Sequence, residues 1–316
     1  MTTFARLARW LLPAAVIAAA AVFPLVAGPY PLAVGQSILL YMALAVSWDM
    51  LLRSGQISFG IAGFFGIGAY ASAVTVLSAG APPVLSILLA GLGAAAVACI
   101  LGFIILRLRK VYFAITTLAL AEIFAVIVHN WDSLTGGAQG LVLPSIIFKG
   151  DGRALFWLAL ASVLLACGAS AFFQRSRLRF ALTAIRNNEA SARSSGINIF
   201  GYLMAAFVVT SFIQGIVGGV QVQMYGFASP DSVFDANYTL LPLAMALLGG
   251  VYSTPGPVLG AVLLGVASEY LKLKIPYGHL VVYGIIILLV ILLLPQGLYG
   301  QYRRRVRAGL GGRGHV

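Results

Sequence analysis

The chain has 316 residues, of which 61% are hydrophobic and only 9% are charged, and its formal net charge is +12. A soluble domain carries about 25% charged residues, so this composition excludes a soluble enzyme or a soluble nucleic-acid-binding protein. Apolar runs long enough for a spanning helix, about 20 residues, recur along almost the whole sequence. The composition therefore predicts an all-α, polytopic membrane protein with a single transmembrane domain over residues 1–316.

Ten apolar segments are the predicted spans, and a range of eight to ten helices fits the sequence. They are 10–28, 32–52, 59–79, 84–106, 111–130, 154–173, 200–223, 238–254, 256–271 and 278–295. The segments 238–254 and 256–271 are short, and Pro255 and Pro257 lie between them. They are either two short spans or one broken, partly re-entrant element.

The basic residues are divided unevenly between the two sides of the membrane. With ten spans and an N-terminus inside the cell, 16 of the 20 Lys and Arg residues fall on one side. This positive-inside pattern predicts that both termini are cytoplasmic. It accounts for the net charge without nucleic acid, and the basic tail 301–316 is expected to anchor at membrane lipids.

Residues 55–73, GQISFGIAGFFGIGAYASA, place five glycines in an apolar span. One interpretation is a tightly packed helix whose seam is formed by Ala62, Gly66 and Ala69 or Ala73, because helices in lipid associate through close backbone approach. The other is that the polar beginning of the stretch is non-helical and lines a protein or water-filled cavity. The second interpretation makes this stretch a candidate for a translocation pathway.

Glu122 is the one acid placed well inside a predicted span. A carboxylate at that depth is expected to face protein or water, which makes it a functional candidate; the alternative is a protonated or hydrogen-bonded packing residue. The glycine-rich segment 249–260 is the expected partner of the 55–73 stretch, as in an inverted repeat. The candidate pathway residues are Gly55, Gln56, Ser58, Gly60, Gly63, Gly66, Glu122, Gly249, Gly250, Pro255 and Gly256.

Residues 174–198, QRSRLRFALTAIRNNEASARSSGIN, form the longest predicted cytoplasmic interruption. Their spacing predicts a short amphipathic helix with an apolar ridge, a separate basic stripe and an acid that pairs with the arginines three residues before and four after it. A glycine then ends it. Such a helix either lies at the membrane interface or docks on a soluble partner that supplies energy. The candidate coupling residues are Leu178, Arg179, Leu182, Ile185, Arg186, Glu189, Arg193 and Gly196.

The remaining motifs indicate no chemistry of their own. A phosphate-binding loop of the GxxxxGK[ST] type and a His, Cys and carboxylate cluster with metal spacing are both absent from the sequence, so neither an enzyme nor a cofactor is expected. Cys99 and Cys167 lie in apolar spans and are interpreted as packing residues. The outer loops 130–153 and 223–239 are either solvated connections or the rim that meets a substrate-delivering protein, and LTGGAQGL in the first is expected to form a tight turn.

Four segments together resemble one family, the LivM-type permeases of branched-chain amino acid ABC importers. They are GQISFGIAGFFGIGAYASA, LTGGAQGL, SRLRFALTAIRNNEASARSSGIN and LLGGVYSTPGPVLGAVLLG, which occur in this order between about residues 35 and 300. The chain departs from the family pattern where Gly then Arg usually precede the coupling helix, because Arg179 and Phe180 stand there. The helix then begins slightly earlier, or Phe180 adds to the docking ridge.

The resemblance implies a multi-pass protein of the bacterial inner membrane. Its implied partners are a second, LivH-like permease, two cytoplasmic ATP-binding subunits and a periplasmic substrate-binding protein. The implied cargo is leucine, isoleucine and valine, with urea, amides or other amino acids as alternatives within the family. A self-contained secondary transporter that uses Glu122 for proton coupling is the rival class, and the scarcity of ionisable groups inside the spans argues against it.

Overall fold

The computed structural model describes residues 18–144, 146–274, 284–285, 288 and 297–301. Over these residues it is almost entirely helical, which confirms the all-α polytopic prediction. Seven described helices are long and apolar enough to cross a membrane. They are α2 (Pro29–Leu52), α3 (Ile61–Ala79), α4 (Pro83–Ile105), α5 (Val111–Asn130), α7 (Gly152–Arg175), α10 (Ile199–Tyr225) and α13 (Pro255–Lys274).

Local sequence accounts for where several of these helices begin and end. Proline begins α2, α4 and α13, where its missing N–H is not needed and its fixed φ suits the first helical position. Gly80 and Gly226 follow α3 and α10 in the left-handed conformation, with φ of 60° and 71°, which glycine adopts without a steric penalty. The predicted spans that match these seven helices differ from them by three residues or fewer at each end.

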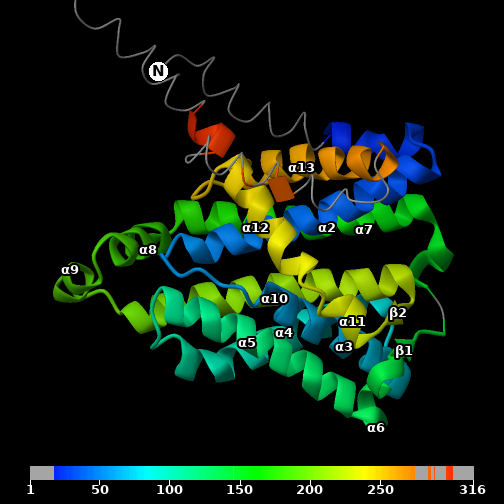
Figure 1. Cartoon of the computed structure of the whole chain (residues 1–316), viewed down its shortest axis with the longest axis horizontal. Coiled ribbons are helices and arrows are strands. Elements are labelled where there is room, and N and C mark those ends of the chain that lie inside the picture. Colours follow the sequence, from blue (N-terminus) through cyan, green and yellow to red (C-terminus); the bar gives the residue numbers. More distant parts are fainter. Residues whose placement is uncertain (1–17, 145, 275–283, 286–287, 289–296, 302–316) are drawn as a thin grey trace, which may run out of the picture.

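The central helix of the bundle is α10. It packs against α3 and α4 on one side and against α2 and α7 on the other, and its apolar window is 72% buried, the largest share among the described spans (Figure 1). Helix α2 then packs against α7, α12 (Asn237–Gly249) and α13. A Cβ on Gly68 of α3 would overlap the backbone of Gly215 in α10, and a Cβ on Gly215 would overlap Ala90 and Ala94 of α4. This close approach is the packing that small residues permit in lipid.

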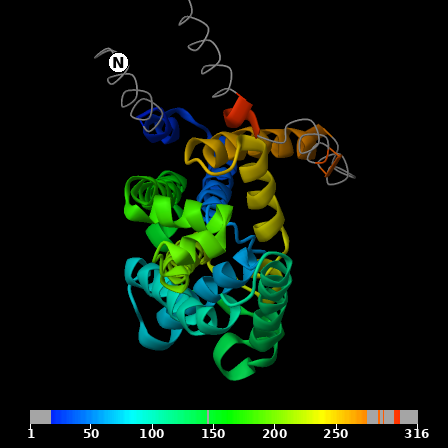
Figure 2. The same ribbon diagram turned by 90° about the vertical axis from the view of Figure 1, so that its left-hand side faces the viewer.

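The segment from α12 to α13 is a broken element. Helix α12 has 13 residues with Pro242 inside it, so it is only about 20 Å long at 1.5 Å per residue, whereas a hydrocarbon core is about 30 Å thick. It lies across the direction of the long helices (Figure 2). After the turn at 250–254 the chain continues as α13, which packs back on α12. The structure fits neither alternative in full: α12 is too short to cross a bilayer by itself, the chain is interrupted at the turn 250–254, and α13 is long enough to span.

One end of the bundle is formed by short elements of the two long loops 130–153 and 223–239, and we call it the outer end after the side predicted for these loops. The first loop contains α6 (Asp132–Thr135), η1 (Gly137–Gln139), β1 (Leu141–Val142) and η2 (Ile147–Gly150), and the second contains β2 (Phe227–Ala228) and α11 (Pro230–Val233). Strands β1 and β2 pair antiparallel (Figure 1). LTGGAQGL forms the predicted tight turn, with positive φ at its glycines.

The other end carries α8 (Arg177–Asn187) and α9 (Glu189–Ser194), together with the chain around residues 53–60 and 106–110 (Figure 1). We call it the basic end, because Arg53, Arg107, Arg109, Lys110, Arg186 and Arg193 belong to it. Of the first predicted span, residues 18–26 are described and helical. Most of the tenth predicted span, 278–295, and nearly all of the tail 301–316 lie outside the described residues.

Candidate functional site

The glycine-rich stretch opens with a non-helical segment inside the protein. Helix α2 ends at Leu52, α3 begins at Ile61, and residues 56–60 between them have no regular secondary structure. Gly55 has a φ of 85°, which lets the chain turn out of α2. Gln56 and Ser58 are only 3% and 4% exposed. The non-helical start that the sequence suggested for this stretch is therefore present and is enclosed by protein.

Side chains from three helices satisfy the backbone of this segment. Trp48 Nε1 of α2 donates to the Ser58 carbonyl at 2.9 Å, and Thr117 Oγ1 of α5 accepts from the Phe59 amide at 3.0 Å. Thr239 Oγ1 of α12 accepts from the Ala62 amide at 3.1 Å and donates to the Phe59 carbonyl at 3.3 Å. A non-helical chain at membrane depth is tolerated only with such internal partners. Thr117, five residues before Glu122 in α5, thus supports this segment.

Gln56 links the segment to the basic end. Its Nε2 donates to the Leu108 carbonyl at 3.2 Å, whereas its Oε1 is buried without a hydrogen-bond partner in the described part of the chain. Buried polar atoms are rarely left unpaired. Gln56 thus has unused acceptor capacity next to the loop that follows α4.

The remaining glycines of the stretch are covered by neighbouring elements. A Cβ on Gly60 would lie 3.1 Å from the Thr117 carbonyl oxygen, and one on Gly63 would lie 3.0 Å from Ala121 Cα, both in α5. A Cβ on Gly66 would overlap the Phe234 ring. In this conformation the glycine face of α3 is therefore closed, and a pathway along it remains a prediction.

The glycine-rich segment 249–260 does not meet these glycines. The nearest atoms to Gly249, Gly256 and Gly260 belong to α12, α13 and the turn between them. Helix α3 instead contacts the beginning of α12 through Thr239. The expected pairing of the two glycine-rich segments, both of which lie within the described residues, is therefore absent. Gly249, Gly256 and Gly260 instead allow α12 and α13 to pack closely against each other.

The turn at 250–254 is held by a buried ion pair that sequence reasoning missed. Asp49 Oδ2 accepts from Arg53 Nη2 at 2.7 Å and from its Nε at 3.0 Å, and the Asp49 side chain is fully buried. The other oxygen of Asp49 accepts from the Tyr252 amide. Arg53 also donates to Ser170 Oγ of α7 at 2.7 Å. The pair thus joins α2, α7 and the broken element.

The same cluster continues to Thr254, whose Oγ1 lies 2.6 Å from Ser170 Oγ. Tyr252 has a φ of 63°, an uncommon conformation for a residue with a side chain that needs support from its surroundings. The guanidinium of Arg186 in α8 lies 4.0 Å from the centroid of the Tyr252 ring, within the range of a cation–π interaction. Helix α8 is therefore in direct contact with the turn of the broken element.

The segment predicted as one amphipathic helix is two. Helix α8 ends at Asn187, and Asn188 caps α9 by accepting from the Ser191 amide at 3.0 Å. Gly196 follows with a φ of 77°, which agrees with the predicted stop. The break at Asn188 arises because an Asn side chain can replace the helical acceptor at an N-cap.

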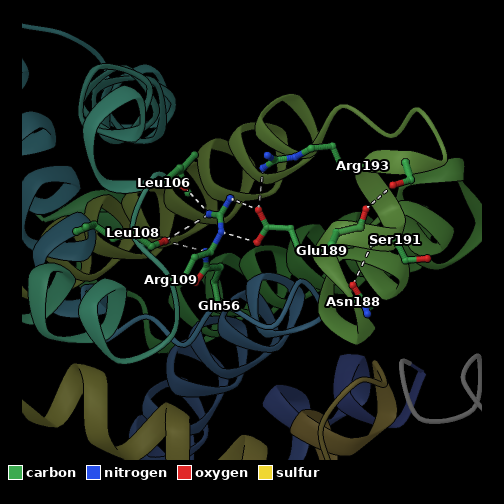
Figure 3. Close-up of polar contacts among 10 residues, drawn as sticks. Gln56, Leu106, Leu108, Arg109, Asn188, Glu189, Ser191 and Arg193 are labelled. Atoms are coloured by element: carbon green, nitrogen blue, oxygen red, sulfur yellow. Dashed lines mark hydrogen bonds and ion pairs between the residues drawn. The ribbon is translucent and has the colours of Figure 1, made fainter.

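Glu189 forms the polar centre of this segment. It binds Arg109 in a bidentate pair at 2.7 and 3.0 Å, and Arg193 at 3.3 Å (Figure 3). The predicted pairing with Arg193 is present, and Arg186 is directed to Tyr252. The hydrogen bonds from Arg109 lower the pKa of the Glu189 carboxyl. The pair ties α9 to the loop that follows α4, across 80 positions of sequence.

The apolar ridge of α8 faces the chain itself. Leu182 and Ile185 are 1% and 7% exposed, Leu178 is partly buried, and α8 packs against α7 and α10. On the other face Phe180 is 73% exposed and Arg179 lies over its ring. The ridge that the sequence suggested for docking is therefore covered, and the surface left for a partner is the one that carries Arg179 and Phe180.

Glu122 lies near the middle of α5, on its exposed face. It lines an open cavity of about 380 Å³ together with residues of α5, α11 and Phe234. Among the described residues, no group of three or more His, Cys, Asp or Glu side chains has the arrangement of a metal site. Cys99 and Cys167 are both free thiols.

Seven helices long enough to cross a membrane, two of them joined to irregular segments inside the bundle, are an arrangement typical of membrane transport proteins. The sequence profile of the family described as "Branched-chain amino acid transport system / permease component" matches residues 31–291. The chain belongs to this family. It is thus a multi-pass membrane permease component and not an enzyme.

Three relatives illustrate the similarity. The high-affinity branched-chain amino acid transport system permease protein LivM of Escherichia coli (strain K12) is 29% identical over 85% of this chain and 70% of its own length. The probable LivM permease of Methanocaldococcus jannaschii is 29% identical over 81% of each chain. The LivH permease of Salmonella typhimurium is 29% identical over 56% of this chain and 61% of its own length. The chain is thus similar to both permease types.

Proposed function

We propose that the chain is the LivM-like permease of an ATP-driven importer of leucine, isoleucine and valine. It would pair with a LivH-like permease, and two cytoplasmic ATP-binding subunits and a substrate-binding protein would complete the assembly. The family match and the names of the relatives support this proposal. The uneven distribution of Lys and Arg supports cytoplasmic placement of the basic end and of both termini.

The observation that carries the mechanism is the contact of α8 with both interruptions of the bundle. Arg186 packs beside Gly55, where a Cβ would lie 3.2 Å from Arg186 Cγ, and its guanidinium lies over Tyr252. A movement of α8 therefore acts on the non-helical segment 56–60 and on the turn 250–254 together. Because ATP hydrolysis takes place on other subunits, these contacts are the route by which it would bias the two access states of the permease.

The exposed face of α8 and α9 is the proposed docking surface for an ATP-binding subunit. Phe180 is the strongly exposed aromatic residue of α8, and the Arg179 guanidinium lies 5.9 Å from the centroid of its ring. Phenylalanine and arginine are both enriched at protein–protein interfaces. The burial of Leu182 and Ile185 gives those two residues the different task of seating α8 on the bundle.

The first experiment measures uptake and co-purification. Proteoliposomes that contain both permeases, both ATP-binding subunits and the binding protein should accumulate radiolabelled leucine only when ATP is present inside. Phe180→Ser should reduce recovery of the ATP-binding subunits with the permease, whereas Phe172→Ser, at a 65% exposed aromatic of α7, should not. Leucine uptake that persists without ATP or any ATP-binding subunit would contradict the proposal and favour a secondary transporter.

The second experiment distinguishes the binding of the ATP-binding subunits from the transmission of their movement through α8 to the permease. Arg186→Met removes the cation–π contact with Tyr252, an interaction of about 0.5–2 kcal/mol, and leaves Phe180 in place. We expect the ATP-binding subunits to remain bound and to hydrolyse ATP while leucine uptake per ATP falls. Unchanged uptake per ATP would contradict a role for the Arg186–Tyr252 contact in transmission.

A further inference from the structure

The cavity around Glu122 has the composition of a small-ligand site. Its volume of about 380 Å³ lies within the range of about 300–1,000 Å³ typical of ligand pockets. The residues that line it are Glu122, Ala125, Val126, His129, Asn130, Pro230, Asp231 and Phe234. Two carboxylates, an imidazole and an amide thus share one cavity with aliphatic and aromatic side chains.

The position of Glu122 indicates that this cavity meets water. At 1.5 Å per residue, Glu122 lies about 16 Å from the start of α5 and about 12 Å from its end, which is near the middle of the helix. The exposed residues around it are apolar, with Ile115, Ile123 and Val126 at 60%, 50% and 60% exposure. A carboxylate at this depth on an exposed face is expected to line a water-filled pathway, because contact with lipid tails is unfavourable for its charge.

The wall of the cavity is fixed by the glycine-rich stretch. The Phe234 ring lies against Gly66, where any side chain would overlap it, and it is stacked with Tyr70 at 6.2 Å between centroids. Gly66 therefore provides the space that Phe234 occupies. Gly66, one of the predicted pathway glycines, thus makes room for an aromatic side chain that lines the same cavity as Glu122.

We propose that this cavity is a low-affinity subsite for a small zwitterion, an α-amino acid with an aliphatic side chain, on the path through the permease. Glu122 and Asp231 would receive the α-ammonium group, and the Asn130 amide and the His129 imidazole would donate to the α-carboxylate. Asn130 Nδ2 already donates to the Val126 carbonyl at 2.8 Å, and its second N–H is available for a ligand. Ala125, Val126 and Phe234 would contact the aliphatic side chain.

This subsite rests on the proposed function. It means that the permease, as well as the binding protein, selects which molecules are transported. The two carboxylates give the cavity a negative charge that favours an ammonium group over a lone carboxylate. An apolar wall without further polar groups favours a hydrocarbon side chain. The subsite therefore discriminates by head group, and it recognises leucine and isopentylamine but not 4-methylpentanoate.

The test uses thiol labelling in the assembled transporter without binding protein. In a chain with Cys99→Ala and Cys167→Ala, Val126→Cys should react with a charged methanethiosulfonate reagent, and millimolar leucine or isopentylamine should slow the reaction. Leu92→Cys, at an exposed apolar position of α4 (57% exposed), is the matched control and should not react. Equal, negligible labelling at both positions would show that lipid or protein covers the α5 face, and it would overturn the proposal.

Charge substitutions decide whether the carboxylate recognises the ligand. Glu122→Gln should reduce protection by leucine about tenfold, which corresponds to about 1.4 kcal/mol. Glu269→Gln is the matched control, because Glu269 lines a different cavity, beside α13, and it should leave protection unchanged. Protection that survives Glu122→Gln, or that 4-methylpentanoate also gives, would overturn the subsite.

ATP-dependent leucine uptake by the unmodified assembly is measured in parallel. If uptake is present and protection is absent, the subsite is wrong and the importer function stands. If uptake is absent while Val126→Cys is labelled and protected, the cavity binds the amino acid and the importer function is wrong. The two failures are therefore distinguishable.

Discussion

The two ends of the bundle hold their irregular segments in different ways. At the basic end, ion pairs hold them. Asp49 and Arg53 hold the turn 250–254, and Glu189 and Arg109 hold α9. At the outer end, the segments are held by glycine turns, by a two-residue β ladder and by the packing of Phe234 on Gly66. Charged contacts can be exchanged as elements move, whereas close steric packing allows few alternatives. We therefore expect substitutions to act on the two ends through different physical causes, electrostatic at the basic end and steric at the outer end.

The largest expected effect comes from the buried pair at the basic end. Asp49→Asn leaves Arg53 buried at 8% exposure without its carboxylate, and breaking such a pair typically costs about 3–5 kcal/mol. Thermal unfolding of the purified protein in detergent measures the loss. The double variant D49N/R53M should be less destabilised than D49N, because it leaves no uncompensated charge. A loss for D49N of about 1 kcal/mol, as for an exposed pair, would contradict the role assigned to this cluster.

A smaller loss is expected from the steric contact at the outer end. Gly66→Ala places a methyl group against the Phe234 ring, and such overpacking costs about 1–3 kcal/mol. Gly168→Ala is the matched control in α7, because no atom lies within 4 Å of a Cβ there, and it should be neutral or slightly stabilising. Equal unfolding temperatures for the two variants would show that Phe234 moves aside easily and that the outer end is not rigid.

The Glu189–Arg109 pair is expected to contribute up to about 1 kcal/mol, because both side chains are about one-third exposed and solvent weakens the pair. Its pH dependence gives a separate signature. Since Arg109 lowers the pKa of Glu189 from its ordinary value of 4.5, the contribution is complete at neutral pH and is lost as the pH falls below about 4.5 through the lowered pKa. Thermal unfolding of wild type and E189Q at a series of pH values should therefore differ at neutral pH and converge in acid. Parallel curves would contradict this assignment.

Arg193→Ala should have the smallest effect. Its side chain is 74% exposed and its distance to Glu189 is 3.3 Å, so the pair is worth about 0.3–0.5 kcal/mol at most. Thermal unfolding of the Arg193→Ala and Arg109→Ala proteins, measured in parallel, should show a smaller loss of stability for Arg193→Ala. An Arg193→Ala loss equal to that of Arg109→Ala would mean that the geometry of Glu189 does not select Arg109 as its main partner.

The sequence predicts the spans well because each is defined by its own hydropathy, and seven of them match described helices within three residues at each end. Contacts between distant segments are harder to predict. The residues next to Arg109 and Thr117 in sequence do not indicate that their partners are Glu189 and Phe59. The amphipathic pattern of α8 likewise predicts an apolar face but not which element covers it. The Asp49–Arg53 pair was within reach, because an acid four residues before an arginine at the end of an apolar span is a recognisable spacing.

The short β ladder at the outer end has a mechanical consequence. Leu141 pairs with Ala228 and Val142 with Phe227, and the Leu143 amide donates to the Gly226 carbonyl at 2.9 Å. These bonds fasten the connection between α5 and α7 to the connection between α10 and α12. A force applied to either connection is therefore shared by α5 and α10, one helix from each half of the chain. The ladder therefore couples the two halves of the chain mechanically at this end of the bundle.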